Sequence, residues 1–195
     1  RQGPGSKEVA NKAIGFLEGL SQSAQIADLG CGTGGQTLLL AQSLPGTITG
    51  VDLMPEFIDV FRKNIQGRNL QSRVKGIVGS MDDLPFEQNS LDLIWSEGAI
   101  DNIGFEQGIS YWRAFLKQGG YVAVTCPSWI TAERPDAVGR FWAEAGSRLD
   151  PVESNIGAMM RCGYQYIASF VLPELCWTEH YFIPREAAIQ ALLEK

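Results

Sequence analysis

The segment Ile26–Gly35 constrains the fold of this 195-residue chain more than any other. An apolar run passes there directly into a glycine-rich loop, and a helical pattern begins at Gln36. A strand that ends in such a loop and continues as a helix is typical of nucleotide-binding α/β folds. Gly30, Gly32 and Gly35 also match the dinucleotide pattern G-x-G-x-x-G, which by itself is a weak signal.

The chain repeats this alternation of apolar runs and helix-like segments. Nearly continuous Val, Ile and Leu content favours strands that are covered on both faces, as in a parallel sheet. We expect strands at Gln25–Leu29, Thr47–Asp52, Val74–Val78, Leu91–Ser96 and Tyr121–Cys126. Apolar residues at helical spacing predict crossover helices at Gln36–Ser43, Pro55–Asn64 and Gly108–Lys117, the last one stopped by Gly119-Gly120.

The pattern changes after the fifth strand. Thr131–Leu149 and Asn155–Arg161 have helical patterns, and a helix at Arg185–Glu194 closes the chain. Tyr164–Leu172 and Cys176–Phe182 have strand composition and a short connection, which favours an antiparallel pair. Because no linker or repeat interrupts the sequence, we expect residues 1–195 to form one domain, with residues 131–162 as a helical insertion after strand five.

The composition narrows the function classes. The chain has 16 Lys+Arg against 22 Asp+Glu and a net charge of −6, so a nucleic-acid partner bound through its phosphates is not expected. No run of about 18 apolar residues exists, so no membrane span is expected.

The four cysteines are scattered and include no C-x-x-C pair: Cys31, Cys126, Cys162 and Cys176. They predict neither a disulfide framework nor a zinc site, and they favour a cytoplasmic location. The start at Arg1 indicates a trimmed chain. Arg1–Ser6 is interpreted as the start of the first helix, with a loop that folds over the ligand as the alternative.

Two acids decide which ligand the glycine loop prefers. Asp28 precedes Gly30 by two residues, so its carboxylate disfavours a pyrophosphate and attracts the ammonium group of S-adenosylmethionine. The loop amides then remain for the methionyl carboxylate. Asp52 follows Gly32 by twenty residues at the end of the second strand, where it can accept hydrogen bonds from both ribose hydroxyls of either ligand.

Five ordered motifs then give a family resemblance: Asp28–Gly34, Asp52, Ser80–Phe86, Leu91–Trp95 and Leu116–Gly120. Over residues 24–130 the chain resembles class I S-adenosylmethionine-dependent methyltransferases of the small-molecule type. The resemblance implies a Rossmann-like, doubly wound α/β fold, with a mostly parallel seven-stranded sheet whose last strand is antiparallel.

The resemblance also implies where S-adenosyl-L-methionine binds, across the carboxyl ends of strands one to four. Asp82 is expected to accept from the adenine amino group, while Leu53 and Met81 either flank the adenine or belong to the core. The complete set of expected cofactor contacts is Asp28, Gly30, Cys31, Gly32, Gly34, Asp52, Leu53, Ser80, Met81 and Asp82.

The implied reaction is in-line transfer of a methyl group to a small-molecule acceptor, without a metal ion. Glu97 and Asp101 follow the fourth strand and are the candidates for a general base, although each can also be a solvated loop acid. The insertion 131–162 is expected on the acceptor side. Two other functions stay open, a nicotinamide-dependent oxidoreductase and a catalytically silent, cofactor-binding partner subunit. These patterns fix neither the acceptor nor the oligomeric state.

Overall fold

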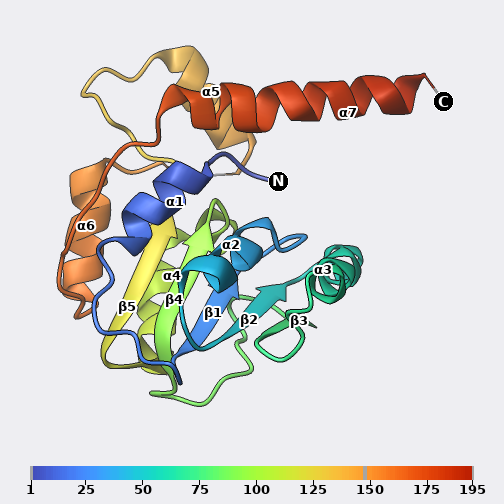
Figure 1. Cartoon of the computed structure of the whole chain (residues 1–195). Coiled ribbons are helices and arrows are strands. Elements are labelled where there is room, and N and C mark those ends of the chain that lie inside the picture. Colours follow the sequence, from blue (N-terminus) through green and yellow to red (C-terminus); the bar gives the residue numbers. More distant parts are fainter. Residues whose placement is uncertain (1, 147–148, 195) are drawn as a thin grey trace.

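A computed structural model describes residues 2–146 and 149–194 and shows a parallel sheet between two layers of helices (Figure 1). The sheet consists of β1 (Gln25–Leu29), β2 (Thr47–Asp52), β3 (Val74–Val78), β4 (Leu91–Glu97) and β5 (Leu116–Thr125). Their order is β3-β2-β1-β4-β5, and every pairing is parallel. The winding reverses between β1 and β4, and ligands bind at such a switch point in doubly wound sheets.

The first face of the sheet is covered by α1 (Lys7–Ile14), α2 (Gly35–Ser43) and α3 (Pro55–Gly67). Phe61 of α3 is fully buried, and its ring lies against the backbone of Gly34, Gly50 and Gly76. Burying a side chain of this size contributes about 1.5–3 kcal/mol. The absence of side chains at three glycines from the loop, β2 and β3 is therefore what lets α3 approach the sheet.

The second face is covered by α4 (Phe105–Trp112), the 3-10 turn η2 (Arg113–Phe115) and α6 (Val152–Arg161). Trp112 and Ile109 of α4 are completely buried. The Trp112 indole Nε1 donates to the carbonyl of Met81 at 2.7 Å, so the loop after β3 is fixed to the sheet through α4.

The amino-terminal four strands and their helices confirm the predicted ranges to within a few residues. β5 is different, because it begins at Leu116 rather than Tyr121. Its pairing with β4 slips between Leu116 and Tyr121, where Gly119-Gly120 forms an irregularity inside the strand. The predicted helix Gly108–Lys117 accordingly ends early, as α4 and η2.

The prediction of a seven-stranded sheet with an antiparallel last strand is wrong for the described residues, which form five parallel strands. Tyr164–Leu172 is irregular, and its first side chain is anchored instead by a 2.7 Å hydrogen bond from the Tyr164 hydroxyl to the Ile109 carbonyl. Cys176–Phe182 forms the end of η3 (Glu174–Cys176) and the π-helical turn η4 (Thr178–Phe182). In η4 the Phe182 amide bonds to the Trp177 carbonyl, so its backbone is satisfied locally, without a neighbouring strand.

The predicted helix Thr131–Leu149 is shorter than expected. α5 spans Asp136–Glu144 and starts directly after Pro135, a residue that fits the first turn of a helix but not its interior. Residues 147–148 lie outside the described residues. The second helix of the insertion is confirmed as α6, and the closing helix is confirmed as α7 (Ile183–Leu193).

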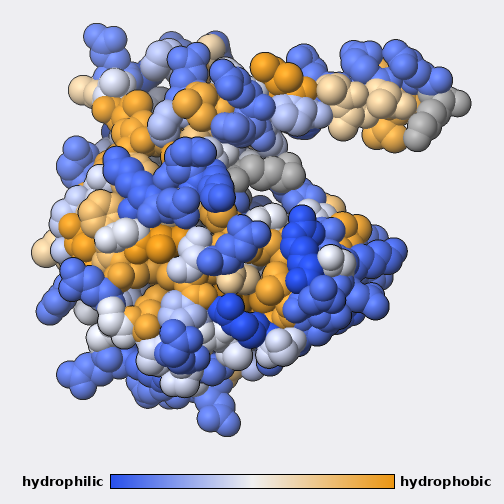
Figure 2. Space-filling view, viewed as in Figure 1, coloured by the Kyte–Doolittle hydropathy of each residue, from blue (hydrophilic) through white to orange (hydrophobic). Residues whose placement is uncertain are grey.

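Helices α5 and α7 lie above the carboxyl ends of the strands, and α7 projects away from the body of the molecule (Figure 1). Neither helix has a buried residue. Figure 2 shows apolar side chains on the surface of α7, where Leu192 and Leu193 are among the most exposed. Within residues 2–146 and 149–194, no helix combines the length and apolar character needed to cross a membrane.

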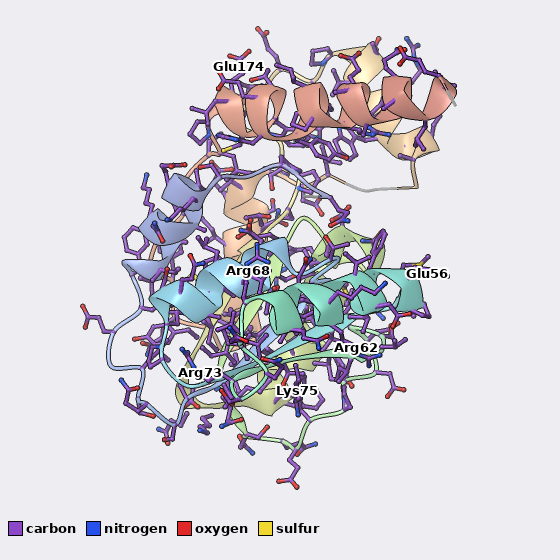
Figure 3. All side chains as sticks on the ribbon, turned by 45° about the vertical axis from the view of Figure 1, so that its right-hand side comes forward. Glu56, Arg62, Arg68, Arg73, Lys75 and Glu174 are labelled. Carbon is purple, nitrogen blue, oxygen red and sulfur yellow. The ribbon has the colours of Figure 1, made fainter. Side chains whose placement is uncertain are left out.

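Arg73 joins the edge of the sheet to the end of α2. Its guanidinium donates to the carbonyls of Gly46, Leu44 and Ala41 at 2.9, 2.7 and 3.3 Å. Figure 3 labels it with the other basic side chains of this edge, among them Arg62 and Lys75. Carbonyls at the end of a helix have no partner within the helix, so Arg73 supplies the donors that α2 lacks.

Candidate functional site

The glycine loop is tied to the end of β2 by backbone hydrogen bonds. The amides of Gly30 and Cys31 both donate to the Val51 carbonyl, at 2.9 and 3.1 Å. A Cβ on Gly30 would lie 2.3 Å from the Cβ of Ala99, so β1 and the segment after β4 meet at that glycine. The Cys31 side chain is buried and turned toward Gly50, away from the outer surface of the loop.

Asp52 is held at the mouth of the loop by two amides. Its Oδ2 accepts from the Gly32 amide at 2.7 Å, and its Oδ1 accepts from the Met54 amide at 3.0 Å. The side chain is only partly buried. Because each carboxylate oxygen has more than one lone pair, both oxygens can accept a further hydrogen bond from a ligand. The twenty-residue spacing therefore does bring an acid to the glycine loop.

The loop faces a cleft of about 80 Å³ that the amino-terminal segment helps to form. The cleft is lined by Gln2, Gly3, Pro4, Gly30, Cys31, Gly32, Gly35, Gln36, Glu97 and Gly98. The Gln2 side-chain oxygen accepts from the Thr33 amide at 3.4 Å and from the Thr33 hydroxyl at 3.2 Å. Residues 2–4 thus lie over the loop, contrary to the interpretation of Arg1–Ser6 as only the start of a helix; Arg1 itself is outside the described residues.

Donors for an anionic ligand remain at the start of α2. Gly34, the residue that precedes this helix, provides no side-chain hydrogen bond, and the next two residues, Gly35 and Gln36, line the cleft. The first-turn amides of a helix have no partner within the helix and carry the positive end of its dipole. The amides of Gly30 to Thr33 already donate to protein oxygens. The first-turn amides of α2, rather than the amides of the loop, are therefore the donors that an anionic ligand can use.

Asp28 lies beneath the loop and is not among the residues that line the cleft. It is 2% exposed, and its Oδ2 accepts from the Thr37 hydroxyl of α2 at 2.6 Å. Burial raises the pKa of this carboxyl from 3.8 to about 7; the Thr37 hydrogen bond opposes the shift, and the charges of Glu97 and Asp52 add to it. Asp28 therefore holds α2 to β1.

The raised pKa of Asp28 predicts a pH-dependent stability. In the unfolded chain the carboxyl ionises near pH 3.8, but in the folded protein it keeps its proton to about pH 7. Folding takes up a proton between these values, so the free energy of unfolding falls as pH rises from about 4 to 7. Asp28→Asn removes this loss. The variant is expected to gain about 3 kcal/mol relative to the wild type between about pH 4.5 and about pH 8, measured by urea unfolding.

The matched control for this experiment is Asp136→Asn, at an exposed position in the first turn of α5. It removes one negative charge without touching β1 or α2, so it should not reproduce the gain in stability expected of Asp28→Asn between about pH 4.5 and about pH 8. A constant difference between Asp28→Asn and the wild type across the same range would show that Asp28 does not carry the pH dependence.

The loops after β2 and β3 carry the residues expected at the adenine. Leu53 is 66% exposed beside Asp52, and the Met81 side chain reaches the outer surface of Gly30. Ser80 donates its hydroxyl to the exposed Asp82 carboxylate. The predicted residues of these two loops thus lie at the ends of β2 and β3, beside the glycine loop. Gly34 differs, because the Phe61 ring covers the position where its side chain would be.

The two candidate bases have different surroundings. Glu97 lines the cleft, and its Oε1 accepts from the Trp95 indole at 2.9 Å and from the Gln36 side-chain amide. Asp101 lies in the short turn η1 (Ile100–Asn102), and its Oδ1 is buried without a hydrogen-bond partner among the described residues. Two side-chain donors thus hold the Glu97 carboxylate in place, whereas one carboxylate oxygen of Asp101 accepts no hydrogen bond from the described residues.

Sequence reasoning missed three contributors to this site. Thr37 and Gln36 lie in the first turn of α2, and Gln2 lies at the amino end. For α2 a signal was present, because polar side chains in the turn after a glycine loop face the same strand ends as the loop. For Gln2 no sequence pattern predicted the contact with Thr33, since that contact depends on how α1 packs.

The fold and the site agree with a known family. A family model described as a methyltransferase domain matches residues 26–120, from β1 into β5. Over residues 26–120 the chain is therefore similar to this family. The matched segment includes the glycine loop, Asp52 and both candidate bases.

Individual relatives support the same assignment. Erythromycin 3''-O-methyltransferase of Saccharopolyspora erythraea is 32% identical over 124 residues, which are 61% of this chain and 39% of the relative. A demethylmenaquinone methyltransferase of Lactobacillus johnsonii is 35% identical over 100 residues, or 50% and 41% of the two chains. The chain spans less than half the length of these relatives.

A solved structure shares the fold over nearly the whole chain. The putative sarcosine dimethylglycine methyltransferase from Galdieria sulphuraria superposes with a TM-score of 0.81 at 20% identity, over 96% of this chain and 71% of the other. At that identity the likeness establishes the common fold.

Proposed function

We propose that the protein is an S-adenosylmethionine-dependent methyltransferase that acts on a small-molecule acceptor. The observation that carries the proposal is the Asp52 carboxylate, held 2.7 Å from the Gly32 amide where the glycine loop opens into a cleft. The described residues fit the cofactor. Asp52 can accept from the ribose hydroxyls, the first-turn amides of α2 can bind the methionyl carboxylate, and the exposed Leu53 can cover the adenine.

When bound, the cofactor supplies an activated methyl group on a sulfonium, so the chain's own residues need only bind, orient and exclude water. Asp52 and α2 would hold the ribose and the methionyl carboxylate of the ligand in a fixed orientation relative to β4. Glu97, fixed by Trp95 and Gln36, presents a carboxylate to the cleft beside Gly98. We assign acceptor-side contacts to residues 131–162, because α6 packs on the face of the sheet that carries η1 and α4.

The relatives reported above carry methyltransferase names, which favours methyl transfer over nicotinamide chemistry. The net charge of −6 supports a small molecule rather than nucleic acid as the acceptor. The four free cysteines are consistent with a reducing compartment, so we propose a cytoplasmic location.

Calorimetric titration with S-adenosylmethionine, S-adenosylhomocysteine, NADH and NADPH tests the proposal. Saturable binding of the two adenosyl ligands, without binding of the nicotinamides, is the expected result. Binding of NADH or NADPH instead would contradict methyl transfer and would indicate a nicotinamide-dependent oxidoreductase. Binding of none of the four would contradict the assignment of the cleft.

The Gln2 contacts predict an effect on affinity. The cleft of about 80 Å³ is smaller than a typical ligand pocket of about 300–1,000 Å³, so a ligand must move Gln2 away from Thr33. Gln2→Ala removes these two hydrogen bonds. We expect S-adenosylhomocysteine to bind about twofold to fivefold more tightly to the variant, measured by calorimetry. Gln22→Ala, at an exposed position before β1, is the control; weaker binding to Gln2→Ala would mean that Gln2 contacts the ligand.

A further inference from the structure

We infer that Asp101, Cys126, Ser128 and Asn155 form a polar site that binds an N–H or O–H group of the methyl acceptor. This inference rests on the proposed function and assigns its substrate class, which is a hydroxyl or an amine rather than an unactivated carbon. Methyl transfer to carbon does not require a hydrogen-bonding proton on the attacking atom, whereas hydroxyls and amines carry one that must leave.

The four residues come together at the carboxyl ends of β4 and β5. Asp101 lies in η1 after β4, Cys126 follows the last residue of β5, and Asn155 belongs to α6. The Asn155 side-chain amide donates to the Ser128 hydroxyl at 3.1 Å and to the Cys126 sulfur at 3.6 Å. The Cys126 and Ser128 side chains are 3.5 Å apart. An amide from α6 and a hydroxyl and a thiol from the loop after β5 thus share one partly buried location.

Asp101 lies at the same edge of the sheet as this group. Glu97 at the end of β4 pairs with Thr125 at the end of β5, and Ile100, next to Asp101, belongs to the same apolar cluster as Cys126. The raised pKa of the Cys126 thiol, caused mainly by burial and opposed by its hydrogen bond with Ser128, also has a contribution from the charge of Asp101. Asp101 Oδ1 is nevertheless buried without a hydrogen-bond partner among residues 2–146 and 149–194. A buried carboxylate oxygen without a donor is strongly unfavourable, and native structures rarely keep one. A ligand donor would satisfy it.

The same contact accounts for the proton in the reaction. The acceptor oxygen or nitrogen forms the new bond to the methyl carbon, and the bond from carbon to sulfur breaks with its electron pair going to sulfur. The proton of the acceptor moves to Asp101 Oδ1. Glu97 is less suited to this step, because the Trp95 indole and the Gln36 amide already donate to its Oε1. Asp101 therefore acts as the base, and Asn155 and Ser128 orient the acceptor.

Cys126 gives a readout that does not require the natural acceptor. The protein is saturated with S-adenosylhomocysteine and alkylated with iodoacetamide, and peptide mass spectrometry measures the rates at Cys126 and at the reference Cys162. Two matched pairs of probes are added: phenol with anisole, and benzylammonium with benzyltrimethylammonium. In each pair the molecules have the same net charge, but only the first has an O–H or N–H donor.

We expect phenol or benzylammonium to slow alkylation of Cys126 about fivefold more than the methylated partner, without changing Cys162. Asp101→Asn should abolish the difference and should by itself speed alkylation of Cys126, because the nearby negative charge is gone. Glu106→Gln, an exposed acid on the neighbouring α4, should preserve the discrimination.

Equal protection by both members of each pair, or protection by none, would overturn the inference. Calorimetric titration of the same sample with S-adenosylhomocysteine distinguishes a failure of the acceptor class from a failure of the proposed function. If the ligand binds but the pairs do not differ, only the acceptor class is wrong. If the ligand fails to bind, the proposed function and this inference both fall.

Discussion

Replacing Asp52 with Ala is expected to lower the affinity for S-adenosylhomocysteine by about 100-fold. The carboxylate accepts from the Gly32 and Met54 amides and is positioned to accept from both ribose hydroxyls. Hydrogen bonds to a charged group contribute about 1.5–3 kcal/mol each, so losing the ligand contacts alone accounts for two orders of magnitude. Calorimetric titration of the wild type and the variant measures the effect.

Two further variants isolate the cause. Asp52→Asn keeps one oxygen acceptor and should lose less affinity than Asp52→Ala. Asp59→Ala removes an exposed acid of α3 that pairs with Arg62, and it should bind like the wild type. If Asp52→Ala binds within about twofold of the wild type, the ribose hydroxyls lie elsewhere and the assignment of the cleft is wrong.

Gly34→Ala is expected to destabilise the fold by about 3 kcal/mol or more. The residue has a φ of +83°, a conformation that L residues rarely adopt, and its added Cβ would lie 1.9 Å from Cδ2 of Phe61. Phe61 is completely buried between α3 and the sheet, so its ring cannot move aside without disturbing both. Thermal and urea unfolding in the absence of ligand measure the loss.

Gly35→Ala provides the matched control one residue away. Nothing lies within 4 Å of a Cβ at Gly35, and the position is the first residue of α2, where Ala is favourable. This variant should be as stable as the wild type or slightly more stable. Similar losses for both variants would show that the loop resists any side chain, and the close approach of Phe61 would not be the cause.

The sequence predicted the sheet where local pattern and tertiary packing agree. β1 to β4 are rich in apolar residues, and the inner strands β1, β2 and β4 are buried along most of their length, as parallel strands covered on both faces are. The prediction failed beyond β5, where Tyr164–Leu172 has strand composition but pairs with no strand among residues 2–146 and 149–194. β propensity reflects a fit to neighbouring strands rather than an intrinsic preference, so composition alone could not decide that segment.

For the site, motif spacing predicted which side chains gather but not what each one contacts. Asp52 and Gly32 lie together as expected, because the ends of adjacent parallel strands meet. Asp28 was expected to attract a ligand ammonium, whereas its carboxylate is buried against Thr37. Its position was visible in the sequence, but its burial depends on how α2 packs over β1.

The hydrogen bond from Trp95 to Glu97 has a practical consequence. The indole of Trp95 is buried in the core, and the Glu97 carboxylate that accepts its hydrogen bond lines the cleft. A buried chromophore is thus in direct contact with a residue of the candidate binding site. A charged ligand beside Glu97 alters the electric field along the indole ring. Trp95 fluorescence can therefore serve as a built-in optical sensor of cleft occupancy, identified by the loss of the ligand-induced signal in Trp95→Phe.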